Sequence, residues 1–387
     1  MLQIFIVRTD GRLGIRNQHR ADRSVRFSVR GSNCMATSTP FTAGTSGYHT
    51  YRIPALVVTP AGMVLALAEG RVSGAGDTGD IDVVLRRSDD GGRNWLPQQV
   101  VVAHGGDTAA NPAVVVEPAS GDVLLLSCRQ PPNVTSQMIR TGEAPPRRIY
   151  VQRSSNDGQT WSEPADISAQ VRPGWMRGYG TGPGHGVALA GGRVVVPCWH
   201  TRTPAGTDTG AETKYYGAHG IYSDNGQTWT VGYTSSEPNG SMNENETACA
   251  VLPDGRLYVN SRCLPDGIVG YRGDAYSTDR GESLVRDIRP QATLPGPDCQ
   301  GSLLTLPDNR LLYSGPSHPS ERAALALWIS DDDGATWRLT RHLTGLPSAY
   351  SDLALLPDGQ TIGVLYETGD WSPYRRIEFA TVPLAAV

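Results

Sequence analysis

Apolar and polar residues follow one another along this chain in short runs, and a turn signal precedes the most regular of them. Each such run has Asp, Gly or Asn at the turn and then residues typical of strands, mostly Val, Leu and Tyr. The copies occupy 59–71, 117–129, 189–200, 252–262, 306–316 and 356–367. Their spacing of roughly 50 to 70 residues suits four short strands with loops, which is one blade of a β-propeller. The pattern therefore predicts an all-β protein, a six-bladed β-propeller.

A second repeat is interleaved with the first. Its frame is Ser-x-Asp-x-Gly-x-Thr-Trp, with Asn156 in place of Asp, Tyr222 in place of Ser and Leu284 in place of Trp. The copies occupy 88–95, 154–161, 222–229, 277–284 and 330–337. In such a frame the Asp caps backbone N–H groups, the Gly adopts a positive φ, and the Trp packs beneath the turn. We interpret these segments as hairpin turns with a structural role.

Composition and charge narrow the classes of function. The 45 Gly and 28 Pro fit a protein with many tight turns, and no apolar run reaches the roughly 18 residues that a membrane span needs. The net charge is −4, and the basic excess is confined to residues 1–34, with seven Arg and two Asp. A nucleic-acid partner is therefore not expected, because the remaining chain is acidic.

Cysteine and histidine spacing argues against a metal site. The six Cys are scattered, with no CxxC pair and no His at zinc spacing, so we expect reduced, mostly buried thiols. His185 and His200 also lack the spacing of metal ligands. We expect no metal and no cofactor.

Residues 1–46 differ in composition from the rest. The apolar patch near the start has no basic residue before it and no small-residue cleavage site after a longer apolar core, so it does not match a secretory signal. We expect 1–46 to be a disordered or mis-assigned extension, with Met35 as a possible initiator, and 47–387 to be one catalytic propeller domain. The expected location is cytoplasmic, and secretion by another route stays open.

The five turn repeats are of the kind called Asp boxes, and the chain opens its organised part with Tyr-Arg-Ile-Pro-Ala-Leu at 51–56. On these motifs it resembles the sialidase (neuraminidase) family of six-bladed propellers, from about residue 48 to residue 384. The Asp box alone does not fix a function, since other propellers carry it. The resemblance implies a monomeric exo-α-sialidase acting on sialylated oligosaccharides, glycoproteins or glycolipids.

The substrate of such an enzyme carries a carboxylate on its anomeric carbon. Arginine suits this anion because its planar fork donates two parallel, charge-assisted hydrogen bonds. The resemblance implies three carboxylate-binding residues: Arg52, Arg262 and Arg322. It also implies that Glu367 orients Arg52 through a salt bridge.

A carboxylate nucleophile would be repelled by the substrate's own carboxylate. A neutral Tyr with a Glu as base avoids that repulsion, and sialidases are the Tyr exception among glycosidases. The resemblance implies Tyr350 as nucleophile and Glu246 as its base. Of the two neighbouring acids, Glu246 rather than Glu244 has the family's spacing of eight residues before Asp254 and sixteen before Arg262.

A general acid is expected in the Gly-rich loop before the first Asp box. The family's spacing selects Asp77, with Asp80 as the alternative, and its pKa would have to rise on closure over substrate to work near neutrality. The resemblance also implies that Arg71 and Asn111 lie near the O4 region of the sugar. Candidates for an N-acetyl pocket, with ordinary packing as the alternative, are Trp175, Met176 and Trp199.

Three functions are compatible with these residues. The first is a retaining exo-sialidase with a Tyr-linked glycosyl-enzyme intermediate. The second is a trans-sialidase or a hydrolase of another nonulosonic acid, which would share the arginine clamp. The third is a non-catalytic propeller that binds acidic glycans. Since no catalytic residue type is missing, the sequence favours the first.

Overall fold

The computed structural model describes residues 6–9, 12–15, 35–235, 242–264 and 270–387. The chain divides into two compact units, Met1–Cys34 and Met35–Val387. The first contains an antiparallel pair, β1 (Ile6–Thr9) and β2 (Arg12–Ile15). Helices in the second are short: α1 (Ser136–Thr141), α2 (Ser168–Val171) and the 3-10 turns Thr213–Tyr215 and Leu384–Ala386. Within the described part of the chain, no helix has the length and apolar character that crossing a bilayer requires.

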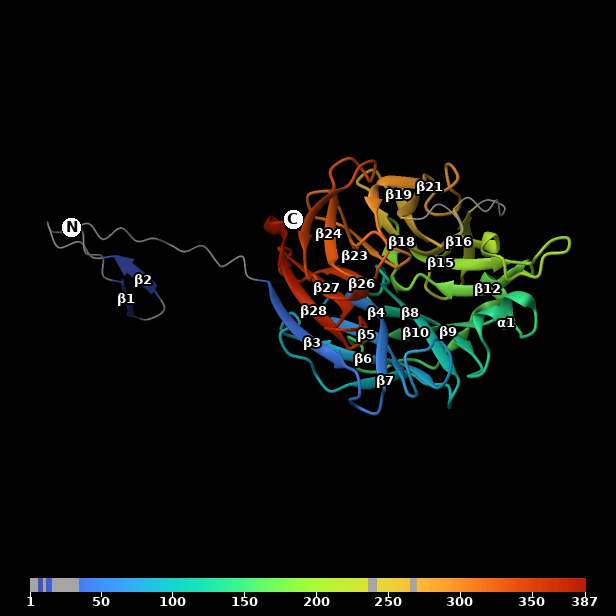
Figure 1. Ribbon diagram of the computed structural model, residues 1–387, viewed down its shortest axis with the longest axis horizontal. Helices are drawn as coiled ribbons and strands as arrows, with labels where there is room; N and C mark the ends of the chain where they lie inside the picture. Colours follow the sequence, from blue (N-terminus) through green and yellow to red (C-terminus); the bar gives the residue numbers. More distant parts are fainter. Residues whose placement is uncertain (1–5, 10–11, 16–34, 236–241, 265–269) are drawn as a thin grey trace. The chain divides into compact units, whose positions relative to one another are not determined.

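The second unit is a β-propeller, whose mostly antiparallel sheets are arranged around a common centre (Figure 1). A nine-stranded sheet contains β4 (Thr50–Val58), β5 (Val64–Arg71), β6 (Ile81–Ser88), β7 (Gln99–Val102), β8 (Thr108–Val116), β9 (Val123–Gln130), β10 (Arg148–Ser154), β11 (Ala165–Asp166) and β13 (Gly184–His185). A five-stranded sheet contains β12 (Met176–Thr181), β14 (Val187–Ala188), β15 (Val194–Arg202), β16 (Tyr216–Ser223) and β17 (Thr230–Thr234).

Three four-stranded sheets complete the circle. They contain β18 (Glu244–Val251), β19 (Leu257–Cys263), β20 (Tyr271–Ser277) and β21 (Arg289–Pro295); β22 (Ser302–Thr305), β23 (Leu311–Pro316), β24 (Leu325–Ser330) and β25 (Arg338–His342); and β26 (Ser348–Leu355), β27 (Thr361–Thr368), β28 (Arg376–Pro383) and β3 (Ala36–Thr42). The prediction of an all-β propeller is confirmed. Hydrogen bonding groups the strands of this unit into five sheets, because β6 and β8 meet where Ile81 pairs with Thr108.

The last sheet takes its outer strand from the beginning of the unit. β3 pairs antiparallel with β28, with Thr42 opposite Arg376 and Ser38 opposite Phe379. The predicted boundary between residues 46 and 47 leaves this strand outside the propeller, whereas the compact unit begins at Met35. The sequence of β3 does not indicate a strand, because an outer strand with exposed and half-buried residues along most of its length needs no continuous apolar run.

Both repeats occupy the places that their turn chemistry predicts. Each copy of the first repeat forms the turn into the second long strand of its run, for example between β4 and β5 or between β26 and β27. Each Asp box joins the two outer strands. In the first box, Gly92 N donates to Ser88 Oγ (2.8 Å), and Asp90 Oδ1 accepts from the N–H groups of Arg93 and Asn94 (3.0 and 2.9 Å).

The third Asp box is one residue shorter than the frame suggested. Alignment on the Trp put Tyr222 at the Ser position, but in the structure Ser223 takes that place and Asn225 takes the place of the Asp. Asn225 Oδ1 accepts from the N–H groups of Gln227 and Thr228 (2.9 and 2.8 Å). The amide oxygen of Asn caps a turn as the carboxylate of Asp does, so the shorter turn still closes.

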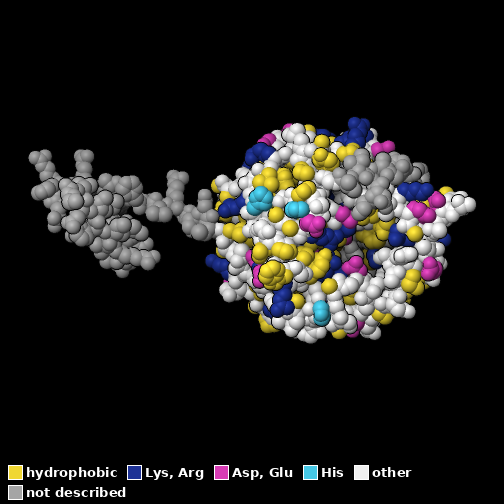
Figure 2. All heavy atoms as spheres, viewed as in Figure 1, with side chains coloured by type: hydrophobic (Ala, Val, Ile, Leu, Met, Phe, Trp, Pro, Cys, Tyr) yellow, Lys and Arg dark blue, Asp and Glu magenta, His cyan; other side chains and the backbone are white. Residues whose placement is uncertain are grey.

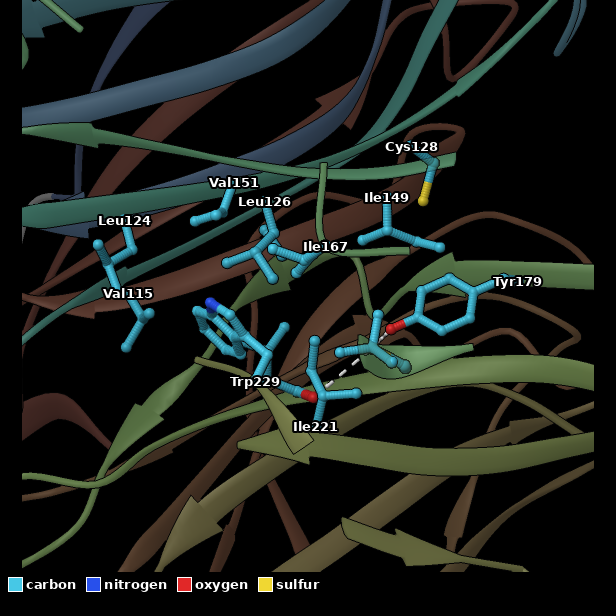
Figure 3. Close-up of a cluster of buried hydrophobic side chains, with 14 of the residues drawn as sticks. Val115, Leu124, Leu126, Cys128, Ile149, Val151, Ile167, Tyr179, Ile221 and Trp229 are labelled. Carbon is cyan, nitrogen blue, oxygen red and sulfur yellow. Dashed lines mark hydrogen bonds between the residues drawn. The ribbon is translucent and has the colours of Figure 1, made fainter. Parts of the chain in front are cut away.

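The core lies between neighbouring sheets. In the cluster of Figure 3, apolar side chains of β9 and β10, such as Leu126 and Ile149, face Ile221 of β16 and Trp229, which directly precedes β17. Tyr179 Oη in the same cluster lies 3.3 Å from Cys198 Sγ. Five of the six Cys are free and buried, and Cys34 lies outside the described residues.

Two histidines meet in the interior of the five-stranded sheet. His200 on β15 and His219 on β16 are both fully buried, and their Nδ1 atoms lie 3.2 Å apart. A bond between two such nitrogens requires one ring to donate and the other to accept, so it fits the neutral pair. Burial lowers the pKa of His219 to about 3.

We expect this pair to make the fold sensitive to acid. Above about pH 6.5 His219 is neutral in the folded and in the unfolded protein. Below that pH it becomes protonated in the unfolded protein but stays neutral in the folded protein, because the folded pKa is lower. The free energy of unfolding should therefore fall by about 1.4 kcal/mol for each pH unit, or about 2 kcal/mol at pH 5, from this residue alone. Urea titrations at pH 7 and pH 5 measure how much unfolding free energy the protein loses between these two values. In His219→Gln this loss should be smaller than in the wild type by about 2 kcal/mol.

The exposed His318 provides the matched control. His318→Gln should leave the difference between the two pH values close to that of the wild type. An unchanged difference in His219→Gln would contradict the proposed origin of the acid sensitivity.

Candidate active site

Four innermost strands of the propeller are interrupted by a shift in register at a predicted site residue. The shifts lie between Arg52 and Ala55 in β4, Ala110 and Ala113 in β8, Glu244 and Thr247 in β18, and Ser348 and Ser351 in β26. A bulge turns a side chain away from the regular alternation of a strand. Ile53 (φ 57°) and Asn111 (φ 55°) have left-handed backbones in two of them, which is unfavourable for a β-branched residue such as Ile.

Tyr350 and Glu246 meet across the centre from β26 and β18. The Tyr350 hydroxyl lies 2.8 and 2.7 Å from the two carboxylate oxygens of Glu246, to which it donates. Arg262 Nη1 donates to Glu246 Oε2 (2.5 Å) and to Tyr350 Oη (2.9 Å). Burial, and then the charge of Glu246, raise the pKa of Tyr350 well above its ordinary value. The phenol is therefore protonated, with its proton directed at a base.

Arg52 is fixed on one edge by Glu367. Arg52 Nε and Nη2 donate to the two carboxylate oxygens of Glu367 (3.1 and 3.3 Å), and both side chains are buried. Glu367 also accepts from the backbone N–H of Ile53 (2.8 Å) and of Tyr350 (3.1 Å). One carboxylate thus holds the strained bulge of β4, the first arginine and the backbone of Tyr350, and it leaves Arg52 Nη1 directed elsewhere.

Asp298 and Tyr374 hold the other arginines. Arg262 Nε donates to the carboxylate of Asp298, and Arg322 Nε and Nη2 donate to the backbone carbonyl of Asp298 (3.3 and 3.1 Å). Arg322 Nη1 donates to Tyr374 Oη (3.2 Å), and the Tyr374 ring lies 4.1 Å from Arg52 Cζ. One tyrosine and one aspartate therefore link all three arginines, of which Arg52 lies in β4, Arg262 in β19 and Arg322 in the loop between β23 and β24.

Glu69 connects the remaining polar residues. It accepts from Arg71 Nε and Nη2 (3.0 and 2.6 Å), and its other oxygen accepts from the backbone N–H of Asn111 (2.8 Å). Arg71 is buried, and its Nη1 lies 2.8 Å from Asp77 Oδ1. The bulge at Asn111 and the arginine are thus tied to the same buried carboxylate.

Asp77 stands over this arrangement on a loop. Its side chain is 74% exposed, and its Oδ1 lies 3.6 Å from Arg52 Nη1 as well as near Arg71. Burial of part of the carboxyl opposes the shift, but the charges of Arg71 and Arg52 lower the pKa of Asp77 below its ordinary value. The upward shift expected for a general acid therefore has to come from a bound substrate. Asp80 uses its backbone carbonyl to accept from Val72 N–H (3.1 Å).

The alternative base Glu244 and the candidates for an N-acetyl pocket have neighbours other than the tyrosine and the three arginines described above. Glu244 pairs in register with Cys263, and burial raises its pKa to about 7. Met176 is buried in the hydrophobic core between neighbouring sheets, so the structure favours the alternative of ordinary packing for this residue. Trp175 packs edge-on against His200, and Trp199 is 7% exposed.

The predicted residues thus gather at the centre of the propeller, and charged side chains of both signs surround a hollow there in Figure 2. Sequence reasoning missed Glu69, Asp298 and Tyr374. Glu69 stands two residues before Arg71, which is a usable signal only once Arg71 is known to be buried. Asp298 and Tyr374 lie in loops without a motif. The described residues contain no group of three or more His, Cys, Asp or Glu that could hold a metal ion.

Comparison with known proteins agrees with this geometry. Residues 62–363 match the family described as BNR repeat-like domain. A sialidase of Micromonospora viridifaciens is 33% identical over 364 residues, which cover 87% of this chain and 53% of that protein. An exo-alpha-sialidase of Aspergillus fumigatus is 30% identical over 350 residues, 83% of this chain and 79% of that one. A solved structure of a Hadza microbial sialidase has a TM-score of 0.79 at 25% identity and covers 91% and 69% of the two chains.

Fold and site together define a β-propeller of the BNR-repeat class with an arginine-rich centre. The chain belongs to the sialidase family, which is a family of glycoside hydrolases. It spans about half the length of the Micromonospora protein and about four fifths of the Aspergillus protein.

Proposed function

We propose that the protein is an exo-α-sialidase that removes terminal α-linked sialic acids with retention of configuration. One observation supports this most strongly: three guanidinium groups surround a single tyrosine that is bonded to a glutamate. Arg52 Cζ and Arg322 Cζ lie 5.2 and 5.4 Å from the Tyr350 ring centre, and Arg262 donates to its hydroxyl. An anion held by the three arginines would place its anomeric carbon next to this oxygen.

On substrate binding, Arg52 would replace its contact with Asp77 by a contact with the substrate. Arg52 Nη1 faces the exposed carboxylate of Asp77, and a substrate carboxylate would replace that contact with a charge-assisted pair. The hydrogen bonds that the three arginines donate to Glu367, Asp298 and Tyr374 stay in place and keep the three guanidinium groups oriented. Asp77 is then separated from Arg52, which removes one of the charges that lower its pKa.

The first chemical step forms a bond between Tyr350 Oη and the anomeric carbon. The Tyr350 proton moves to Glu246, and Asp77 donates its proton to the glycosidic oxygen as the bond to the leaving group breaks. Arg262 donates hydrogen bonds to Glu246 Oε2 and to Tyr350 Oη, and it stabilises the negative charge that develops on the Tyr350 oxygen. In the second step Asp77 takes a proton from water, the water oxygen displaces Tyr350, and Glu246 returns the proton to the phenol.

We also propose that the catalytic domain is a propeller of six blades. The nine-stranded sheet consists of two antiparallel runs, β4 to β7 and β8 to β11, that meet in one parallel pair at Ile81 and Thr108. Each run carries one copy of the turn repeat and one Asp box. Counting these runs separately supports a blade for each of the six turn repeats.

Product analysis tests this function. The purified protein is incubated with 4-methylumbelliferyl sialoside and with 3′-sialyllactose, and proton NMR follows the first anomer released. The α-anomer is expected to appear first and then to mutarotate. First release of the β-anomer would contradict retention, and tight binding without release would indicate a glycan-binding propeller. Sialyl transfer to an added galactoside would indicate a trans-sialidase.

A further inference from the structure

Trp371 is the exposed exception among the eight tryptophans of the chain. Its side chain lies in the loop between β27 and β28 and is 96% exposed, whereas the other seven are buried or half-buried. Indole is a large apolar surface with one polar N–H, and folding normally covers much of it. Packing of the fold therefore does not explain this position.

The loop that presents Trp371 is a tight turn with a hydrogen bond on each side of the tryptophan. Gly369 N donates to Pro347 O (3.3 Å), and Tyr374 N donates to Ser372 Oγ (3.3 Å). A side chain at Gly369 would collide with Ser372 O and with Arg375 Cβ, so the turn is tight. An aromatic group on a fixed support loses little freedom when it binds a ligand.

The same loop reaches the arginines of the candidate site. Tyr374 follows Trp371 by three residues, and it lies against Arg52 (4.1 Å) and accepts from Arg322 Nη1 (3.2 Å). Three residues span at most about 10 Å, so Trp371 stands at the rim of the site.

The general acid borders the same arginine. Asp77 Oδ1 lies 3.6 Å from Arg52 Nη1, while Tyr374 covers the face of that guanidinium. The leaving group must depart beside the acid that protonates it. Its departure path therefore passes the rim that carries Trp371.

We propose that Trp371 is a platform for the leaving-group sugar, a neutral hexose linked to the sialic acid. The inference rests on the proposed sialidase function and adds a second subsite to it. The C–H face of a pyranose packs on an aromatic face, and the exposed indole N–H is free to bond a hydroxyl of the same ring. Substrates with a sugar leaving group are then favoured over those with a small one.

The test compares two substrates with different leaving groups. For Trp371→Ala, kcat/KM is measured with 3′-sialyllactose and with α-sialosyl fluoride, whose fluoride cannot reach the rim. The ratio of the two values should fall on the order of tenfold, the size of one aromatic contact, and Trp371→Phe should recover most of it. Leu339→Ala, an exposed apolar residue on the outer strand β25, is the control whose ratio should stay unchanged.

The outcomes separate the two proposals. A wild-type ratio in Trp371→Ala, or an equal loss on both substrates, overturns the platform while leaving the sialidase function in place. Failure of the wild-type protein to hydrolyse either substrate overturns the proposed function and the platform with it.

Discussion

Tyr350→Phe is expected to lower kcat for 4-methylumbelliferyl sialoside by at least about a thousandfold, because it removes the atom that forms the bond to the anomeric carbon. KM should change far less, since Arg52, Arg262 and Arg322 keep their anchors on Glu367, Asp298 and Tyr374. Steady-state kinetics and the melting temperature are measured together, because the lost hydroxyl also accepts a hydrogen bond from Arg262.

Tyr276→Phe is the matched control for this substitution. Its hydroxyl donates to a backbone carbonyl of Asp333 (3.1 Å), on an outer part of the propeller. It should retain wild-type kcat. If Tyr350→Phe keeps kcat within about tenfold of the wild type while remaining folded, Tyr350 is not the nucleophile.

The second large effect on activity is expected from substitution of Asp77, and its size should depend on the leaving group of the substrate. Asp77→Asn should lower kcat/KM for 3′-sialyllactose by about 10² to 10³-fold, because a sugar alkoxide needs a proton as it leaves. With 4-methylumbelliferyl sialoside the loss should be below about tenfold, since that phenolate leaves without much help.

The pH profile gives an independent reading of Asp77. Arg71 and Arg52 lower the pKa of Asp77 in the free protein, so its acid form is abundant only at low pH. For sialyllactose, kcat/KM should therefore decline as the pH rises from the acid range to neutrality, and Asp77→Asn should flatten that limb. Asp80→Asn serves as the control because Asp80 is the alternative acid. A leaving-group dependence found in Asp80→Asn and absent from Asp77→Asn would reverse the assignment.

The fold was predictable to the extent that each turn carries its own chemistry. The Asp boxes and the six turn repeats are local, since Ser88 and Asp90 bond to backbone within six residues of themselves. The exceptions are non-local. β3 joins the last sheet only through its pairing with β28, more than 300 residues later, so no local pattern could include it.

The residues of the candidate site also fall into those that local sequence motifs could indicate and those that only contacts between distant segments bring together. Arg52, Glu246 and Tyr350 could be selected because the segments that contain them resemble motifs of the sialidase family. Asp298 and Tyr374 could not, because a lone Asp or Tyr in a loop has no distinguishing neighbour. Their contacts with Arg262 and Arg322 exist only when different sheets converge.

By itself the sequence determined the class of fold and the turns, because periodicity and turn propensity are properties of short segments, and its motifs supported the family resemblance that implied the site residues. Tertiary structure alone decided how these groups act together. It placed the Tyr350 hydroxyl against Glu246, strained β4 at Ile53, closed the propeller with β3 and set Asp77 between two arginines. These relations join residues far apart in the chain, and their energies depend on burial and on distances of a few ångströms, which no linear spacing encodes.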